Sequence, residues 1–335
     1  MSYIIVVNPL ILSAGGVPVA AAVTATCIGA AVMTIAMGLI ANRPLACASG
    51  MGINSIVAYT LCGAMGLGWQ TAMAIIFIEG IAILLLVLCG LREAIMDAIP
   101  VSLRHGISIG LGLFIAMIGL KDGGIIVANE ATMVALGKVT DPVFLVGLIS
   151  IVATVVLSSM NVKGALLWGI VIASVLGIPL GVTAAPSNIV APLDFSTFGA
   201  PFMADADGVM GVVKALTTPA LLLFAFSLMM SDFFDTMGTA MAVAKQGEFL
   251  TEDGKVEDIK PILIVDSVAA AAGGVFGASS ITTFVESASG AADGGRSGLT
   301  SVTAGVLFLL AAFFSRLSAA SAPPPPVAPS CTSAF

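Results

Sequence analysis

Three acidic residues lie in stretches of sequence that are otherwise apolar. Asp232 and Asp235 stand one helical turn apart in LLLFAFSLMMSDFFDTMGTAMAVA, and Glu286 follows in a second apolar stretch that contains several glycines. In a lipid bilayer each such carboxylate opposes insertion by about 2.5–3.5 kcal/mol. Side chains with this cost usually line the path of a solute or an ion. The three acids therefore indicate a membrane transporter.

Asp232 and Asp235 are spaced i, i+3, so they share one face of a helix. Gly238 and Thr239 continue that face with small side chains, which leaves room for a ligand. Burial and a neighbouring acid both favour proton uptake by such a carboxylate. We therefore expect proton coupling, with sodium as an alternative ion. Hydrogen bonding between helices is the structural alternative.

Glu286 is expected near the start of a short helix, where free N–H groups and a partial positive charge are available. The glutamate could simply cap this helix. Alternatively, it could accept hydrogen bonds from N–H groups of a ligand while backbone N–H groups donate to ligand carbonyls. That combination suits a flat heterocycle with both donors and acceptors.

Two further acids lie in apolar segments. Asp266, in ILIVDSVAAAAGG, is expected to serve ion coupling or structural hydrogen bonding. Glu79, in IIFIEGIAILLL, is weaker evidence, because it could face a cavity or another domain.

Composition excludes several classes of protein. The chain is 59% hydrophobic and 9% charged, whereas soluble proteins carry about 25% charged residues, so a soluble protein is excluded. A net charge of −7 without any basic block gives nucleic acid no surface to bind. The five cysteines form no CxxC pair and there is a single histidine, so we expect no metal or cofactor apart from the coupling proton. The sequence contains no serine paired with a histidine at a nucleophile elbow and no glycine-rich phosphate-binding loop, so we do not expect an enzyme.

The apolar residues form ten segments after a partial first one, which predicts an all-α protein that crosses the membrane many times. The segments are 1–12, 17–41, 44–62, 68–90, 100–120, 142–159, 164–182, 217–244, 260–277, 279–293 and 298–315. With the N-terminus in the cytoplasm, alternation places eight basic residues inside, Arg92 among them, and three outside. This split fits the positive-inside rule and a location in the cytoplasmic membrane.

Two of these segments differ from ordinary membrane-spanning helices. The stretch 44–61 contains Gly50-Met51-Gly52 followed by Asn54, and the stretch 278–295 opens with small and β-branched residues from Ser279 to Thr283. Each predicts a short strand that leads into a half-helix. Paired interrupted segments point to the binding site of an inverted-repeat transporter. The alternative is that the glycines only allow close helix packing.

Several stretches resemble the purine permeases of the AzgA-like branch of the nucleobase:cation symporter type 2 superfamily. They are VNPLILSAGG, RPLACASGMGINSIVAY, SDFFDTMGT, VDSVAAAAGGVFG and TTFVESASGAADGGRSGLTSV. The resemblance runs from Met1 to about Phe314. It favours the hypoxanthine, guanine and adenine branch over the uracil and xanthine branch.

The resemblance implies a fold of fourteen segments in two inverted repeats of seven, with a core domain and a gate domain. On that basis residues 1–94 and 217–315 form the core, and 95–216 form part of the gate. The last three gate helices and half of the first segment are expected to be missing, as from a frameshift or truncated gene model. Residues 316–335, with the run Pro323–Pro326, are expected to be disordered or polyproline II.

The resemblance also implies site residues and partners. Gly52, Asn54, Asp235 and Glu286 are expected to bind a purine nucleobase, and Asp232 and Asp266 to serve proton coupling. The expected function is proton-coupled import of hypoxanthine, guanine or adenine by a protein embedded in membrane lipid. A gate-domain homodimer is compatible with this fold. The alternatives are an inactive fragment of such a permease, or an anion transporter or channel on the same fold.

Overall fold

The computed structural model describes most of the chain. The described residues are 1, 3–92, 119–121, 123–129, 132–160, 162, 165–182, 193–205, 207–251 and 255–313, with isolated positions between 95 and 117. The expected segment 100–120 therefore lies almost entirely outside the described residues. The expected proline-rich tail, 316–335, lies wholly outside them.

The N-terminal part of the chain forms helices and one short strand. Its elements are α1 (Ile4–Ala14), α2 (Val19–Ala36), the π-helix η1 (Met37–Ala41), β1 (Cys47–Ser49), α3 (Met51–Ser55), the π-helix η2 (Ile56–Ala64) and α4 (Trp69–Leu88). The structure thus confirms the expected helices at 1–12, 17–41 and 68–90 to within a few residues.

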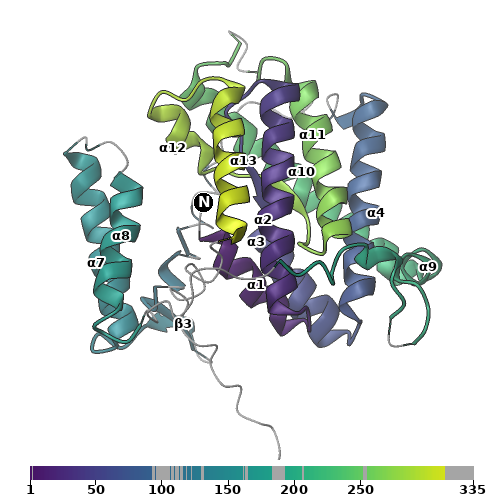
Figure 1. Ribbon diagram of the computed structural model, residues 1–335, viewed down its shortest axis with the longest axis horizontal. Coiled ribbons are helices and arrows are strands. Elements are labelled where there is room, and N and C mark those ends of the chain that lie inside the picture. Colours follow the sequence, from purple (N-terminus) through teal and green to yellow (C-terminus); the bar gives the residue numbers. More distant parts are fainter. Residues whose placement is uncertain are drawn as a thin grey trace, which may run out of the picture.

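The C-terminal part repeats the same order of elements. Its elements are α10 (Pro219–Gly247), α11 (Ile259–Phe276), β4 (Ile281–Thr283), α12 (Ser287–Ala292) and α13 (Gly298–Phe313). In both parts two helices precede a three-residue strand, a short helix and a further helix. The two parts pack side by side, with α2 against α13 and α4 against α11 (Figure 1).

The two predicted strands form a small antiparallel sheet at the centre of this bundle. Cys47 pairs with Thr283 and Ser49 with Ile281, and all six strand residues are buried. The backbone N–H of Gly50 also donates to the carbonyl of Ser280, which extends the contact to the start of α3. Strand pairing satisfies the backbone groups that a non-helical segment exposes within the bundle. The predicted extended pieces in both interrupted segments are therefore confirmed.

Close contacts between helix backbones depend on glycine. A Cβ atom added at Gly80 of α4 would lie 2.2 Å from the backbone nitrogen of Ala271 in α11. A Cβ atom at Gly298 would lie 2.0 Å from the carbonyl oxygen of Gly38. Small residues at such positions let membrane helices approach closely.

We expect the substitution Gly80→Val to destabilise the protein strongly. The added side chain must push α4 away from α11, and overpacking of this kind usually costs at least about 1–3 kcal/mol. Thermal unfolding of the detergent-purified protein measures the effect. Gly290→Ala is the matched control, because no atom lies within 4 Å of the added Cβ. Equal melting temperatures for the two variants would contradict the packing described here.

The remaining described elements lie outside this repeated arrangement. Helices α7 (Pro142–Ser159) and α8 (Ala165–Gly177) pack mainly against each other, and Figure 1 shows this hairpin set apart from the other helices. Most of the side chains of α7 are at least partly exposed. Because they are apolar, they provide a surface suited to lipid or to another apolar partner.

The prediction of an all-α protein is wrong in one region. A hairpin of β2 (Ile126–Asn129) and β3 (Met133–Leu136) precedes α7. Its strands are only four residues long and mostly exposed, so they carry no alternation of polar and apolar residues that would reveal them. The described part of the loop 183–216 likewise contains α9 (Gly211–Thr217), which we did not predict.

Lys214 ties α9 to the preceding loop. Its ammonium group lies 2.5 Å from a carboxylate oxygen of Asp207 and 3.1 Å from one of Asp205. Hydrogen bonds to these two acids raise the pKa of Lys214 above its ordinary value. Asp205 also accepts a hydrogen bond of 2.7 Å from Thr71 in α4, so this cluster anchors the loop to the bundle.

Five of the described helices are long and apolar enough to cross a membrane. They are Val19–Ala41, Trp69–Leu88, Pro142–Ser159, Pro219–Gly247 and Ile259–Phe276. Shorter apolar helices span Ile4–Ala14, Met51–Ala64 and Gly298–Phe313. These eight helices correspond to eight of the segments expected from the sequence, and the expected segments 164–182 and 279–293 are not among them.

Candidate functional site

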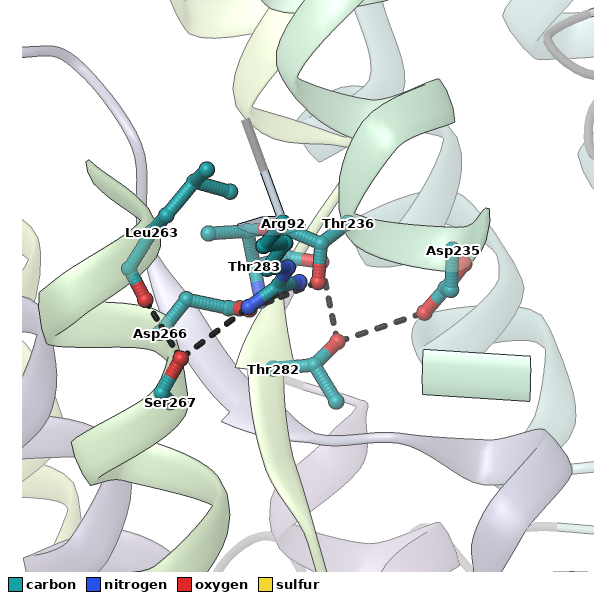
Figure 2. Close-up of polar contacts among 8 residues, drawn as sticks. All are labelled: Arg92, Asp235, Thr236, Leu263, Asp266, Ser267, Thr282 and Thr283. Carbon is teal, nitrogen blue, oxygen red and sulfur yellow. Dashed lines mark hydrogen bonds and ion pairs between the residues drawn. The ribbon is translucent and has the colours of Figure 1, made fainter. Parts of the chain in front are cut away.

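The predicted acidic residues of the site lie around strand β4, and they divide into two groups. Thr282 contacts Asp235 on one side, and the backbone of Thr283 contacts Asp266 on the other. Figure 2 shows Asp235 and Asp266 on either side of the strand. The acids therefore form two clusters.

The first cluster is centred on Glu286 and also contains Asp235, Thr282 and Tyr3. Glu286 occupies the position immediately before α12, but its carboxylate makes no capping hydrogen bond. It accepts a hydrogen bond of 2.5 Å from the hydroxyl of Tyr3 instead. The sequence left open whether Glu286 only caps a helix. The hydrogen bond from Tyr3, at the start of α1, favours a different role for the carboxylate.

Asp235 joins this cluster from α10. Its carboxylate accepts a hydrogen bond of 3.2 Å from the hydroxyl of Thr282, and it is close enough to Glu286 for their charges to interact. Both acids are partly exposed. Asp235 and Glu286 therefore lie in one cluster, and each accepts a hydrogen bond from a hydroxyl group.

Asn54 connects the half-helix α3 to α1. Its fully buried side-chain amide donates a hydrogen bond to the Oδ1 atom of Asn8. Asn8 in turn donates to the hydroxyl of Thr26 at 2.7 Å and to the carbonyl of Ala278 at 3.2 Å. The Oδ1 atom of Asn54 has no hydrogen-bond partner among the described residues. Gly52, partly buried in the first turn of α3, adds no side chain to this region.

The second cluster is centred on Arg92 and Asp266. The guanidinium of Arg92 donates to Asp266 at 3.0 Å and to the hydroxyl of Ser267 at 3.0 Å (Figure 2). Asp266 also accepts from the hydroxyl of Thr236 at 2.7 Å and from the backbone N–H of Thr283 at 3.1 Å. Both charged side chains are completely buried. Asp266 therefore joins α10, α11 and β4, which favours the structural alternative for this residue.

Arg92, which the sequence placed among the basic residues on the cytoplasmic side, is completely buried. Helix α4 ends at Leu88, and Gly90 follows with a φ of 69°, a left-handed conformation that suits glycine. Arg92 then contacts Asp266 and Ser267 of α11. A basic residue after an apolar segment resembles an ordinary flanking charge, so the sequence offers no local sign of this burial.

Asp232 belongs with the second cluster although it lies one turn from Asp235. Its side chain is fully buried, and neither carboxylate oxygen has a hydrogen-bond partner among the described residues. It is close enough to Asp266 and Arg92 for their charges to interact. Asp232 and Asp235 thus leave the same face of α10, but their side chains lie in different surroundings.

Sequence reasoning missed four residues that form hydrogen bonds with the predicted site residues: Tyr3, Asn8, Thr282 and Arg92. Polarity within an apolar stretch could have singled out Asn8 in YIIVVNPLIL. Among the residues that the structure describes, no group of three or more histidine, cysteine, aspartate or glutamate side chains is arranged to hold a metal ion.

Comparison with known proteins identifies relatives over nearly the whole chain. The adenine permeases AdeQ and AdeP of Escherichia coli are 40% and 39% identical to it, and each match covers 95% of this chain and 69% of the relative. The guanine/hypoxanthine permease PbuO of Bacillus subtilis is 37% identical, with 95% of this chain and 72% of the relative covered.

A solved structure with 15% sequence identity, the transmembrane domain of the cyanobacterial bicarbonate transporter BicA, has the same fold. The match has a TM-score of 0.60 and covers 96% of this chain and 82% of that chain. The family model Xan_ur_permease, described as "Permease family", matches residues 1–329. The chain therefore belongs to the xanthine/uracil permease family, whose members are multi-pass membrane transporters and not enzymes.

Proposed function

We propose that this protein is a secondary transporter that imports purine nucleobases across the cytoplasmic membrane by proton symport. The observation that carries the proposal is that Asp235 and Glu286, neither of them a fully buried residue, lie beside β4 close enough for their charges to interact. The family relatives named as adenine and guanine/hypoxanthine permeases support a purine as the substrate.

The chemistry of the Glu286 cluster suits a purine. Purine bases carry ring or exocyclic N–H donors, and ionised carboxylates form the strongest hydrogen bonds with such donors. The hydroxyl of Thr282 and the free Oδ1 atom of Asn54 add further polar groups at the start of the two half-helices. We propose that Asp235 and Glu286 bind the base directly, while Asn54 and Gly52 shape the site.

We further propose that the fold consists of two inverted repeats of seven segments. The repeated order of elements supports this arrangement, as does the antiparallel pairing of β1 with β4. Under the repeat, α2 corresponds to α11 and α4 to α13, so the contacts α2–α13 and α4–α11 are equivalent. The core then comprises 1–94 and 217–315, while the separate α7–α8 hairpin belongs to a gate within 95–216. Transport proceeds as the core moves against the gate.

Uptake of radiolabelled bases tests the proposed function. The protein is produced in cells that lack their own permeases, and adenine, hypoxanthine, guanine and uracil are supplied with and without a protonophore. We expect purine uptake that collapses with the proton gradient and little uptake of uracil. Uptake that survives the protonophore would contradict proton coupling, and uptake of uracil in place of purines would contradict the substrate.

The hydroxyl of Tyr3 orients Glu286, so Tyr3→Phe is expected to weaken purine uptake moderately. Loss of one hydrogen bond worth about 0.5–1.5 kcal/mol corresponds to a rise in KM of about 2- to 13-fold. Initial uptake rates over a range of purine concentrations measure the change. Tyr59→Phe is the control, because Tyr59 is 58% exposed. An unchanged KM in Tyr3→Phe would show that this hydroxyl does not orient the binding carboxylate.

A further inference from the structure

Glu79 is a buried acid to which the proposed binding site gives no role. It lies near the middle of α4, its exposed fraction is 0%, and neither carboxylate oxygen has a hydrogen-bond partner among the described residues. Leaving an ionised carboxylate buried without donors is very unfavourable, and such a group binds a proton instead. Its surroundings therefore favour the neutral carboxyl.

Asp232 is in the same situation on the facing helix α10. Its exposed fraction is also 0%, and both of its oxygens lack partners. Glu79 and Asp232 are close enough for their charges to interact. A buried pair of acids without donors resists simultaneous ionisation, because the second negative charge would be repelled by the first.

The other charged groups around this pair do not neutralise it. Asp266 faces it from α11, Asp235 lies one turn along α10, and Arg92 faces it from the chain that follows α4. The thiol of Cys47 in β1 lies near Asp266. Arg92 is the one cation among them, and its hydrogen bonds go to Asp266 and Ser267, while its Nε atom has no partner among the described residues.

Resting on the proposed function, we propose that Glu79 and Asp232 form the pair that carries the coupling proton, whereas Asp266 is held in an ion pair with Arg92. The proton is taken from water on one side of the membrane and released to water on the other. The only bond that forms and breaks is the O–H bond of a carboxyl group.

The position of Asp232 explains how the proton would favour substrate binding. An ionised Asp232 places a negative charge one helical turn from Asp235 and disfavours ionisation of that residue. A protonated Asp232 removes the repulsion, so Asp235 can carry the negative charge that accepts a purine N–H group. Binding of proton and purine is therefore mutually favourable, as symport requires.

Infrared difference spectroscopy of the purified full chain tests the pair without any transport measurement. A protonated carboxyl has a C=O stretching band that a carboxylate lacks. At neutral pH we expect this band in the unmodified protein, a weaker band in Glu79→Gln and in Asp232→Asn, and an unchanged band in Glu248→Gln, whose side chain is 67% exposed. A band as strong as that of the unmodified protein in both Glu79→Gln and Asp232→Asn would overturn the proposal. Glu79→Asp, which keeps the acid, is the second variant if Glu79→Gln does not fold, and it should keep the band.

Transport in proteoliposomes separates coupling from a structural role. In Glu79→Gln we expect exchange of internal for external purine to continue, while an imposed pH gradient no longer concentrates purine above the external level. Accumulation with the pH dependence of the unmodified protein would overturn the proposal, and so would equal loss of exchange and accumulation. If the unmodified protein moves no purine at all, the proposed function fails, and the infrared bands still decide whether the pair holds protons.

Discussion

Purine uptake at low purine concentration is expected to fall sharply when Glu286 is replaced by glutamine. The substitution keeps the size of the side chain but replaces a charged acceptor with a neutral amide that places an N–H₂ group towards the ligand. A hydrogen bond to a charged group contributes about 1.5–3 kcal/mol, so purine binding should weaken about 10- to 150-fold. Competition of unlabelled purine against labelled uptake measures the apparent affinity.

The control for this experiment is Glu248→Gln. Glu248 forms an ion pair with Arg296 in which both side chains are more than half exposed, so its loss should leave uptake unchanged. Insertion of both variants in the membrane at equal levels excludes a folding defect. If Glu286→Gln took up purine at the rate of the unmodified protein, Glu286 could not be a binding residue.

The largest effect on stability is expected from Arg92→Met. This change leaves Asp266 as a buried charge without its cationic partner, and breaking a buried ion pair in this way typically costs about 3–5 kcal/mol. Because Asp266 also holds Thr236 and the backbone of Thr283, the strand next to Glu286 should lose order as well. Thermal unfolding of the purified protein measures the loss.

A double-mutant comparison isolates the ion pair. Removing both charges with Arg92→Met and Asp266→Leu should recover part of the stability lost in Arg92→Met, since no unpaired charge remains. Arg296→Met, which breaks an exposed pair, is expected to change stability by at most about 1 kcal/mol. A melting temperature for Arg92→Met as high as that of Arg296→Met would refute the structural role of the buried pair.

Much of the site could be predicted because acidic residues are rare in apolar segments. The cost of burying Asp235 and Glu286 made them conspicuous, and their segments contained the glycine and β-branched residues that mark the half-helix and the strand. The structure places these two acids together and confirms β1 and β4. Length and hydropathy were also sufficient to find α7 and α10, because long apolar runs have few alternatives in a membrane.

What could not be predicted depends on contacts between distant segments. Arg92 and Asp266 are separated by 174 positions, and nothing near either residue reveals its partner. The i, i+3 spacing placed Asp232 and Asp235 on one helix face, but the neighbouring elements give them different surroundings. Asp235 meets Thr282, whereas Asp232 faces Glu79 and Arg92. Sequence spacing determines on which face of a helix a side chain lies, whereas its contacts depend on the elements packed against that face.

Direct binding of bases to the purified protein tests the central claim most directly. Isothermal titration with adenine, hypoxanthine, guanine and uracil would be carried out on the unmodified protein and on the double variant Asp235→Asn, Glu286→Gln. We predict saturable binding of at least one purine, little heat from uracil, and loss of purine binding in the double variant while its melting temperature is retained. Purine binding of equal affinity in a folded double variant, or binding of uracil without any purine, would contradict the site described here.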